Sequence, residues 1–208
     1  FGGYLAEILR AEGINSFQVA QLSATTSSSL ANFRLVVLAE TPLTLSQATT
    51  FSDYVAAGGR LITMRPDAKL LPALGLSAAG NSTTEGYLSI YAGSATGAGF
   101  PVTTLPFHGT ATNFVADAGA TTLATLYSNQ TTPRAYPAVV QSGRTVTWAY
   151  DLARSVLYTR QGDPGNAGVD RDGLEPIRTN DIFYNWIDKD RVYIPHADIQ
   201  MRLFARAI

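Results

Sequence analysis

The chain has 208 residues and a formal net charge of −1, and charged residues make up 15% of it, against about 25% in an average globular protein. This near-neutral balance excludes a strong electrostatic attraction to nucleic acid or to an anionic membrane. No apolar run approaches the roughly 18 residues of a membrane span, so we expect no membrane insertion. The sequence contains no cysteine, which excludes thiol nucleophiles, cysteine-ligated metals and disulfides.

The first element is an amphipathic helix, predicted over residues 4–13 because Leu5, Ile8 and Leu9 share one helical face. Residues 17–20 have the pattern of a short strand. A doubly wound sheet normally places a strand before its first helix, and none is available here. We therefore expect the chain to begin inside a domain, as a fragment of a longer chain. A domain that starts with a helix is the alternative.

Residues 34–67 predict a strand, a helix and a second strand. Leu35–Leu38 is a continuous apolar run, typical of a strand covered on both faces, and Arg60–Met64 is a similar run. Between them, Thr44 and Gln47 have the spacing of a capping box at a helix start. We expect one βαβ unit with parallel strands.

The next segment, from about residue 75 to residue 129, is rich in Gly, Ser and Thr and predicts a β-rich insertion of short strands. After it, two apolar runs at 137–140 and 145–150 flank a Gly-containing turn and predict a hairpin. Four further elements are expected to follow: a short helix at 151–158, a polar loop at 161–179, a helix at 180–187 and an amphipathic helix at 195–208.

Three stretches carry a resemblance to a known family: VVLAE, LSQATTFSDYVAAGGRLI and PAVVQSGRTVTWAYDL. They resemble the class I glutamine-amidotransferase-like superfamily, and more distantly the trehalose-utilisation-like proteins and the trimerisation domain of β-galactosidases. The whole chain is similar to uncharacterised domains of large bacterial secreted proteins. The resemblance implies one α/β domain over residues 1–208, with a three-layer flavodoxin-like fold and a mostly parallel sheet flanked by helices.

The catalytic residues of that family are missing from the matching positions. Amidotransferases place a Cys nucleophile at the sharp turn after the strand that Arg60–Met64 matches, and this turn reads Met64-Arg65-Pro66-Asp67 here. The family's His and Glu follow the late strand, where this chain has residues 148–151, Trp-Ala-Tyr-Asp. The resemblance therefore implies no amidotransferase activity and favours a non-catalytic protein.

The carboxyl ends of parallel strands are where open α/β sheets bind ligands. We expect Arg65, Asp67, Asp151 and Arg171 to meet there in a polar pocket that a sugar could occupy. Four tyrosines are candidates for stacking on a sugar, although packing into the fold is the alternative for each: Tyr87, Tyr91, Tyr136 and Tyr158. For His108 and His196 we expect structural hydrogen bonding.

The loop at 161–179 concentrates Asp163, Asp170, Asp172 and Glu175 around flexible glycines. Carboxylate oxygens of this kind suit Ca²⁺, which is the one cofactor that the sequence suggests. The spacing does not match an EF-hand. The alternative is a loop held together by its own salt bridges, because arginines are interleaved with the acids: Arg160, Arg171 and Arg178.

Taken together, these patterns predict a non-catalytic module, for binding or assembly, of a larger exported bacterial protein, secreted or at the cell surface. Its expected partners are other domains of that protein and glycans, with carbohydrate as the candidate ligand. The export prediction rests on a Ser/Thr-rich composition with two lysines, Lys69 and Lys189. The alternative is a glycan-directed hydrolase that uses acidic residues of the 151–175 region, with Asp151, Asp163, Asp170 and Asp172 as candidates.

Overall fold

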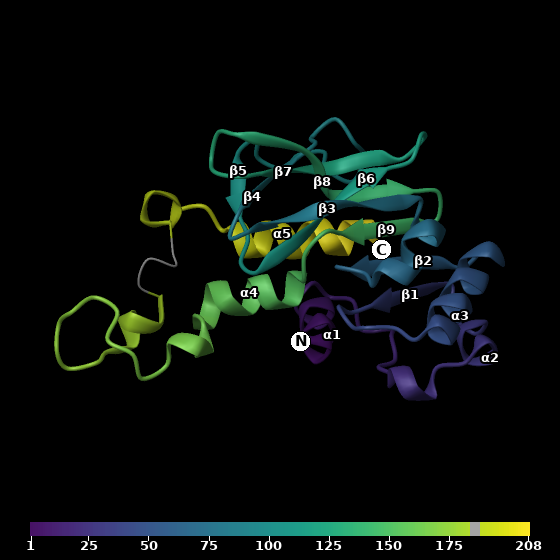
Figure 1. Ribbon diagram of the computed structural model, residues 1–208, viewed down its shortest axis with the longest axis horizontal. Coiled ribbons are helices and arrows are strands. Elements are labelled where there is room, and N and C mark those ends of the chain that lie inside the picture. The colour runs from purple at the N-terminus through teal and green to yellow at the C-terminus, as the bar shows by residue number, and fades with distance from the viewer. Residues whose placement is uncertain (184–187) are drawn as a thin grey trace.

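The computed structural model describes residues 1–183 and 188–208 (Figure 1). Its centre is a seven-stranded sheet of order β1-β2-β9-β8-β7-β4-β5, accompanied by a two-stranded sheet of β3 and β6. The strands are β1 (Leu35–Leu38), β2 (Arg60–Met64), β3 (Leu76–Thr84), β4 (Tyr87–Ile90), β5 (Thr104–Pro106), β6 (Thr110–Ala116), β7 (Thr121–Tyr127), β8 (Pro133–Ser142) and β9 (Thr145–Trp148).

The helices form two groups. In one, α4 contacts both α1 and α5; in the other, α3 contacts α2 and the short η2. The α-helices are α1 (Gly2–Ala11), α2 (Ser27–Leu30), α3 (Leu45–Ala56), α4 (Leu152–Gln161) and α5 (His196–Ala207). The 3₁₀ helices are η1 (Leu22–Ala24), η2 (Ala68–Leu74), η3 (Pro164–Asn166), η4 (Thr179–Phe183) and η5 (Lys189–Arg191). None of the helices in the described ranges has the length and apolar character needed to cross a membrane.

The predicted βαβ unit is confirmed. β1 pairs with β2 in parallel, with Leu35 opposite Arg60, and α3 lies between them in the chain. The capping box is formed, because Thr44 Oγ1 accepts a hydrogen bond from the Gln47 N–H at 3.2 Å and Gln47 Oε1 accepts one from the Thr44 N–H at 2.8 Å. Phe51 of α3 is buried in the core.

The sheet is mixed, so the prediction of a mostly parallel sheet is wrong. β1, β2 and β9 are parallel to one another, but the other four of the six pairings, β9 with β8, β8 with β7, β7 with β4 and β4 with β5, are antiparallel. The predicted hairpin accounts for the first reversal, because the short turn between Ser142 and Thr145 returns the chain beside the strand it has just left. Strands β3 to β7 lie in the segment predicted to be β-rich.

Two predicted elements differ from the structure. Residues 17–20 form no strand and pair with no neighbour in the described part of the chain. Of the helix predicted at 180–187, the described part belongs to the 3₁₀ helix η4 (Thr179–Phe183), and residues 184–187 lie outside the described residues. A strand pattern alone is insufficient at 17–20, because strand backbone groups need a paired neighbour.

Large aromatic side chains fix the end of β9, where the site begins. Trp148 packs edge-on against Phe204 of α5, with ring centroids 5.6 Å apart, and Phe107 stacks on Tyr150 at 4.7 Å. The buried Tyr150 hydroxyl donates to Gln200 Oε1 at 2.7 Å. Burial raises the pKa of Tyr150, so the phenol stays protonated. The segment that precedes Asp151 is therefore fixed by two buried aromatic residues: Trp148 packs against α5, and Tyr150 contacts Phe107 and Gln200.

Candidate functional site

Charged residues follow the three parallel strands at the same edge of the sheet. Glu40 comes two residues after β1, Arg65 directly follows β2, and Asp151 lies three residues after β9. Because β1, β2 and β9 are parallel, their carboxyl ends meet at this edge, which is where ligands bind in open α/β sheets. We call Glu40, Arg65, Thr112, Asp151 and Arg154 the elbow cluster.

Arg65 occupies a strained turn. Its backbone φ is 37°, and within the described residues Glu85 is the one other non-glycine residue with a positive φ. The Arg65 N–H donates to the carbonyl of Trp148 at 2.9 Å, which ties the turn to the end of β9. A left-handed conformation costs an L-residue about 1–2 kcal/mol, and such strain persists where the surrounding structure fixes it.

The Arg65 side chain is bound at two of its nitrogens. Nη1 donates to Glu40 Oε1 at 2.7 Å, and Nε donates to Thr112 Oγ1 at 3.2 Å. The second oxygen of Glu40 lies 3.4 Å from Nη2 of Arg154. The side chains of Arg65, Arg154 and Glu40 are 29%, 28% and 21% exposed. One carboxylate therefore lies between two guanidinium groups in a partly desolvated setting.

Asp151 is the most deeply buried member of the elbow cluster, with 5% of its surface exposed. It begins α4, and its Oδ1 accepts a hydrogen bond from the Arg154 N–H at 3.2 Å. Burial raises the pKa of Asp151, the nearby Glu40 carboxylate raises it further, and the Arg154 N–H and guanidinium lower it. Arg65 and Asp151 thus both interact with Glu40 at this edge of the sheet, and their part in ligand binding stays a prediction.

A second side-chain pair, Glu85 and His108, adjoins the cluster. Glu85, with a φ of 49°, places its Oε2 2.7 Å from Nδ1 of the buried His108, and the His108 N–H donates to Ser155 Oγ of α4 at 3.0 Å. A Cβ added at Gly109 would lie 3.3 Å from Cδ of Arg154. The hydrogen bonding predicted for His108 is confirmed. For His196, Nδ1 is buried and has no hydrogen-bond partner within the described residues.

Asp67 and Arg171, the other two residues of the predicted pocket, form hydrogen bonds outside the elbow cluster. Asp67 caps η2 and accepts hydrogen bonds from the N–H groups of Leu43 and Lys69, at 3.0 and 2.9 Å, which lower its pKa. Arg171 lies in the loop after α4, where Nη1 donates to Asn166 Oδ1. Among the described contacts, none joins Asp67 or Arg171 to Arg65 or Asp151. The part of each in ligand binding stays a prediction.

The predicted metal ligands fall into different surroundings. Asp170 and Asp172 are joined by Asp181, and one carboxylate oxygen of each lies within 4.8 Å of the other two. Asp163 instead caps η3 through the Gly165 N–H. Glu175 precedes Pro176 across a cis peptide bond.

Basic and backbone donors already bind these acids. Arg178 Nη2 donates to both oxygens of Asp172, at 3.0 and 2.8 Å. The N–H groups of Arg178 and Arg171 donate to Asp181 at 2.8 and 3.1 Å, and the first of these does most to lower its pKa. These contacts favour a loop held by its own salt bridges, and the Ca²⁺ site stays a prediction.

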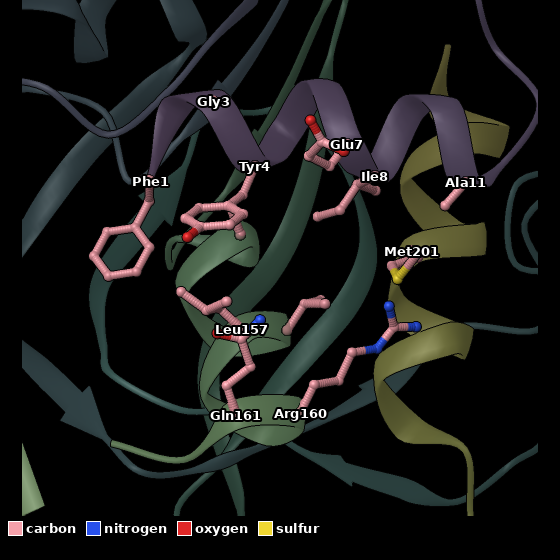
Figure 2. Close-up of a pocket in the computed structure, with 12 residues that line it drawn as sticks. Phe1, Gly3, Tyr4, Glu7, Ile8, Ala11, Leu157, Arg160, Gln161 and Met201 are labelled. Carbon is pink, nitrogen blue, oxygen red and sulfur yellow. The ribbon is translucent and has the colours of Figure 1, made fainter. Parts of the chain in front are cut away.

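A groove of about 650 Å³ lies beside the elbow cluster, between α1, α4 and α5. Figure 2 shows Phe1 and Tyr4 projecting from the α1 side, and Arg160 and Gln161 from α4. Phe1 and Tyr4 are 42% and 44% exposed. The Phe1 ring lies 4.8 Å from the Arg154 guanidinium carbon, so one residue that lines the groove contacts the elbow cluster.

The tyrosines predicted to stack on a sugar differ in accessibility. Tyr91 is exposed, whereas Tyr136 is partly buried against the core. The Tyr87 hydroxyl donates to Asp188 Oδ2 at 3.0 Å, and the Tyr158 ring packs edge-on against Phe1 at 5.8 Å. Tyr4 was not among the predicted residues. Tyr4 lines a groove that exists only because α1 packs beside α4, and that packing could not be read from the sequence.

Comparison with known proteins supports the fold. No family model and no curated protein matches the chain. Among solved structures, a glutamine amidotransferase from Thermotoga maritima is 12% identical, with a TM-score of 0.55 over 97% of this chain and 90% of that one. An exo-β-1,4-mannosidase from Opitutaceae bacterium strain TAV5 is 14% identical, with a TM-score of 0.54 over 76% of this chain and 27% of that one. A cytoplasmic protein from Salmonella typhimurium is 16% identical, with a TM-score of 0.53 over 72% and 75%. The chain therefore has a glutamine-amidotransferase-like α/β fold with a mixed sheet.

Proposed function

We propose that this chain is a non-catalytic binding or assembly module of a larger exported bacterial protein, with carbohydrate as its ligand. The observation that carries the proposal is the residue at the turn after β2. The backbone there keeps a strained, left-handed conformation, but the residue is Arg65 and its guanidinium is held by Glu40 and Thr112.

An arginine in this position cannot replace a nucleophile. The guanidinium remains protonated at every physiological pH and offers no lone pair for attack. Its bonds to Glu40 and Thr112 also keep the side chain in one place. We infer that the turn has a structural or ligand-orienting role, with no covalent chemistry.

The residues at the end of β9 likewise have structural roles. Asp151 Oδ1 caps α4, and the backbone before it is fixed by the contacts of Trp148 and Tyr150. A carboxylate that caps a helix from a buried position is poorly placed to deliver a proton to a bound substrate. This supports a module over an enzyme.

The carbohydrate part of the proposal rests on the groove. Phe1 and Tyr4 offer apolar ring faces, and Glu7, Arg160 and Gln161 offer charged or amide groups along the same groove. Sugars present apolar C–H faces and hydroxyl edges, which such a mixture of side chains can contact. The exo-β-1,4-mannosidase, in which the matched region is 27% of the chain, is consistent with this fold serving as one part of a larger protein.

The test measures turnover and binding on the same purified protein. We expect no release of ammonia from glutamine and no hydrolysis of nitrophenyl glycosides, together with binding to members of a glycan array. Tyr4→Ala should weaken that binding at least about tenfold, a loss of about 1.4 kcal/mol. Tyr193→Ala is the matched control, because Tyr193 is 79% exposed and does not line the groove. Glycan binding that is unchanged in Tyr4→Ala would refute the assignment to the groove.

One observation favours the alternative, a glycan-directed hydrolase that uses acidic residues of the 151–175 region. The pKa of Asp151 is raised by burial and by the Glu40 carboxylate. An acid of raised pKa near a second carboxylate is the arrangement that glycoside hydrolysis uses. Asp172, the other acid considered for this role, is bound to Arg178 and Asn180 in the loop.

The two proposals separate in one assay. A hydrolase loses turnover in Asp151→Asn and in Glu40→Gln, whereas a module has no turnover to lose. Hydrolysis by the unmodified chain that disappears in both variants would establish the alternative. Hydrolysis that persists in both, and also in Asp163→Asn, Asp170→Asn and Asp172→Asn, would indicate a contaminating enzyme, and the module would stand.

A further inference from the structure

Residues 162–183 form an arm that projects from one end of the molecule, whereas α3, β1 and β2 lie at the opposite end (Figure 1). The arm is closed at its base, because the Asp163 N–H donates to the carbonyl of Ile182 at 3.4 Å. A Cβ built at Gly162 would lie 2.8 Å from Cγ2 of the same Ile182. The arm is therefore a closed surface loop, and ordered loops on a rigid scaffold often carry function.

Polar contacts hold the arm together and leave its aliphatic side chains on the surface. Arg178 donates to both oxygens of Asp172, and the N–H groups of Arg171 and Arg178 donate to Asp181. Because these contacts already order the arm, it would lose little conformational entropy on binding a partner. Three aliphatic side chains of the arm are 46%, 59% and 47% exposed: Val169, Leu174 and Ile177.

The arm is acidic, and the rest of the chain is basic. Residues 162–183 contain five acids and two arginines, a net charge of −3, so the other residues carry +2 within the total of −1. Glu175 lies in the chain between the exposed Leu174 and Ile177, and it takes part in none of the ion pairs of the described residues. Residues 174–177 therefore present a carboxylate between two aliphatic side chains.

Three arginines begin the parallel strands, at the edge of the sheet opposite the elbow cluster. Arg34 directly precedes β1, Arg60 is the first residue of β2, and Arg144 directly precedes β9. The Arg60 N–H donates to the carbonyl of Arg34 at 3.0 Å, and the Leu61 N–H donates to the carbonyl of Arg144 at 3.1 Å. Neighbouring strands lie about 4.8 Å apart, so the three arginines form one row, which we call the basic edge.

The basic edge carries positive charge on the surface of the molecule, because all three arginines are exposed. Arg60 donates to two carbonyls at the C-terminal end of α5, at 3.3 and 3.1 Å. Arg34 and Arg144 take part in none of the ion pairs of the described residues. Phe33, which precedes Arg34, is 39% exposed. Positive charge beside an exposed ring complements the carboxylate and aliphatic side chains of residues 174–177.

We propose that the arm of one copy of this chain docks on the basic edge of a second copy, with Glu175 facing Arg34 and Arg144. The aliphatic side chains beside Glu175 would pack on Phe33, and complementary charge would orient the two copies. The inference goes beyond the proposed glycan binding, because neither surface includes residues that line the groove.

The two surfaces lie at opposite ends of the molecule (Figure 1), so the contact between copies is heterologous. When one copy has docked its arm, its own basic edge stays accessible to a third copy. Heterologous contacts of this kind produce open chains or closed rings. We therefore expect assembly to continue beyond a dimer.

Sedimentation velocity of the unmodified chain over a concentration series tests the proposal. In about 0.1 M salt we expect the weight-average sedimentation coefficient to rise with concentration. The rise should be smaller in about 1 M salt, because the Debye length falls from about 10 Å to about 3 Å. A coefficient that stays constant up to about 1 mM chain, a very weak affinity for a specific contact, would overturn the proposal.

Charge reversal identifies the two surfaces. Glu175→Arg changes the arm, and the double variant Arg34→Glu, Arg144→Glu changes the basic edge. We expect self-association to be at least about tenfold weaker in each. Glu12→Arg is the matched control, because it makes the same change of charge at the end of α1, outside both surfaces. Association that persists in either surface variant, or that is lost equally in the control, would overturn the proposal.

An equimolar mixture of the two surface variants gives a readout that a folding defect does not produce. The arm of Glu175→Arg then meets the reversed edge of the double variant, and the unmodified arm of the double variant meets an unmodified basic edge. We expect the mixture to regain the concentration dependence of the unmodified chain. A mixture that stays monomeric would overturn the pairing of these two surfaces.

These outcomes are separate from those of the proposed function. None of these substitutions changes the groove, so glycan binding by Glu175→Arg should equal that of the unmodified chain. Absence of self-association would refute the docking of the arm and leave the glycan-binding result unaffected. Turnover by the unmodified chain would refute a non-catalytic module and leave the self-association result unaffected.

Discussion

Glu40 Oε1 accepts a hydrogen bond of 2.7 Å from Nη1 of Arg65, across the carboxyl ends of β1 and β2. The same carboxylate lies 3.4 Å from Arg154 of α4. Through this one side chain, the two strands and the helix after β9 are joined at the edge of the sheet where the candidate site lies. The fold at this edge therefore depends on charge pairing as well as on apolar packing.

Glu40→Gln should destabilise the protein by about 1–3 kcal/mol, because it leaves two partly buried guanidinium groups without their shared anion. Urea unfolding at neutral pH measures the change. Glu7→Gln is the control: Glu7 pairs with Arg10 on an exposed surface, and exposed pairs contribute about 0–1 kcal/mol. Equal losses of unfolding free energy in Glu40→Gln and Glu7→Gln would show that Glu40 stabilises the fold no more than an exposed ion pair does.

Arg65→Gly should be more stable than Arg65→Ala by about 1 kcal/mol. Both variants lose the contacts with Glu40 and Thr112, but glycine adopts the φ of 37° without the steric cost that alanine incurs. Thermal or urea unfolding of the pair gives the difference.

Arg60 provides the matched comparison, because it lies in β2 with ordinary strand geometry. There the order should reverse, with Arg60→Ala more stable than Arg60→Gly, since glycine weakens a strand. If alanine were the more stable replacement at both positions, strain at Arg65 would be excluded.

Much of the fold could be predicted because local signals and tertiary structure agree. The capping box of Thr44 and Gln47, the apolar runs of β1 and β2, and the β8–β9 turn each specify a structure within a few residues. The direction of the remaining strands could not be predicted. β7 has the alternating pattern of a strand, but that pattern does not state whether a neighbour runs parallel or antiparallel.

The site was predicted in part for a similar reason. Arg65 and Asp151 directly follow strand patterns, so the rule for carboxyl ends identifies them. The same rule applied to β1 would have identified Glu40. The pairing of Glu85 with His108 could not have been found, because it depends on a left-handed backbone at a glutamate, for which the residue type gives no signal.

Asp151 should make the protein less stable as the pH rises. Its pKa is raised in the folded protein, so the folded state binds its proton more tightly than the unfolded chain. The contribution is most favourable below the ordinary value of 3.8 and is lost as the pH rises through the folded value. Asp151→Asn keeps an oxygen to cap α4 but does not titrate. The stability of the unmodified protein minus that of Asp151→Asn should therefore fall as the pH rises above 3.8, as measured by urea unfolding, and a constant difference would contradict the assignment.

Calcium should leave the melting temperature of the unmodified chain nearly unchanged, because Arg178 already binds Asp172 and backbone N–H groups bind Asp181. Arg178→Ala removes that competing cation, and in this variant we expect calcium to raise the melting temperature. The calcium ion would bind Asp170, Asp172 and Asp181, because one carboxylate oxygen of each lies within 4.8 Å of the other two. Scanning calorimetry with and without calcium measures the shift, and magnesium is the control because it demands a tighter octahedral geometry. The double variant Arg178→Ala, Asp170→Asn should lose the effect. A calcium shift already present in the unmodified chain and abolished by Asp170→Asn alone would instead show that the loop is a calcium site in its native form.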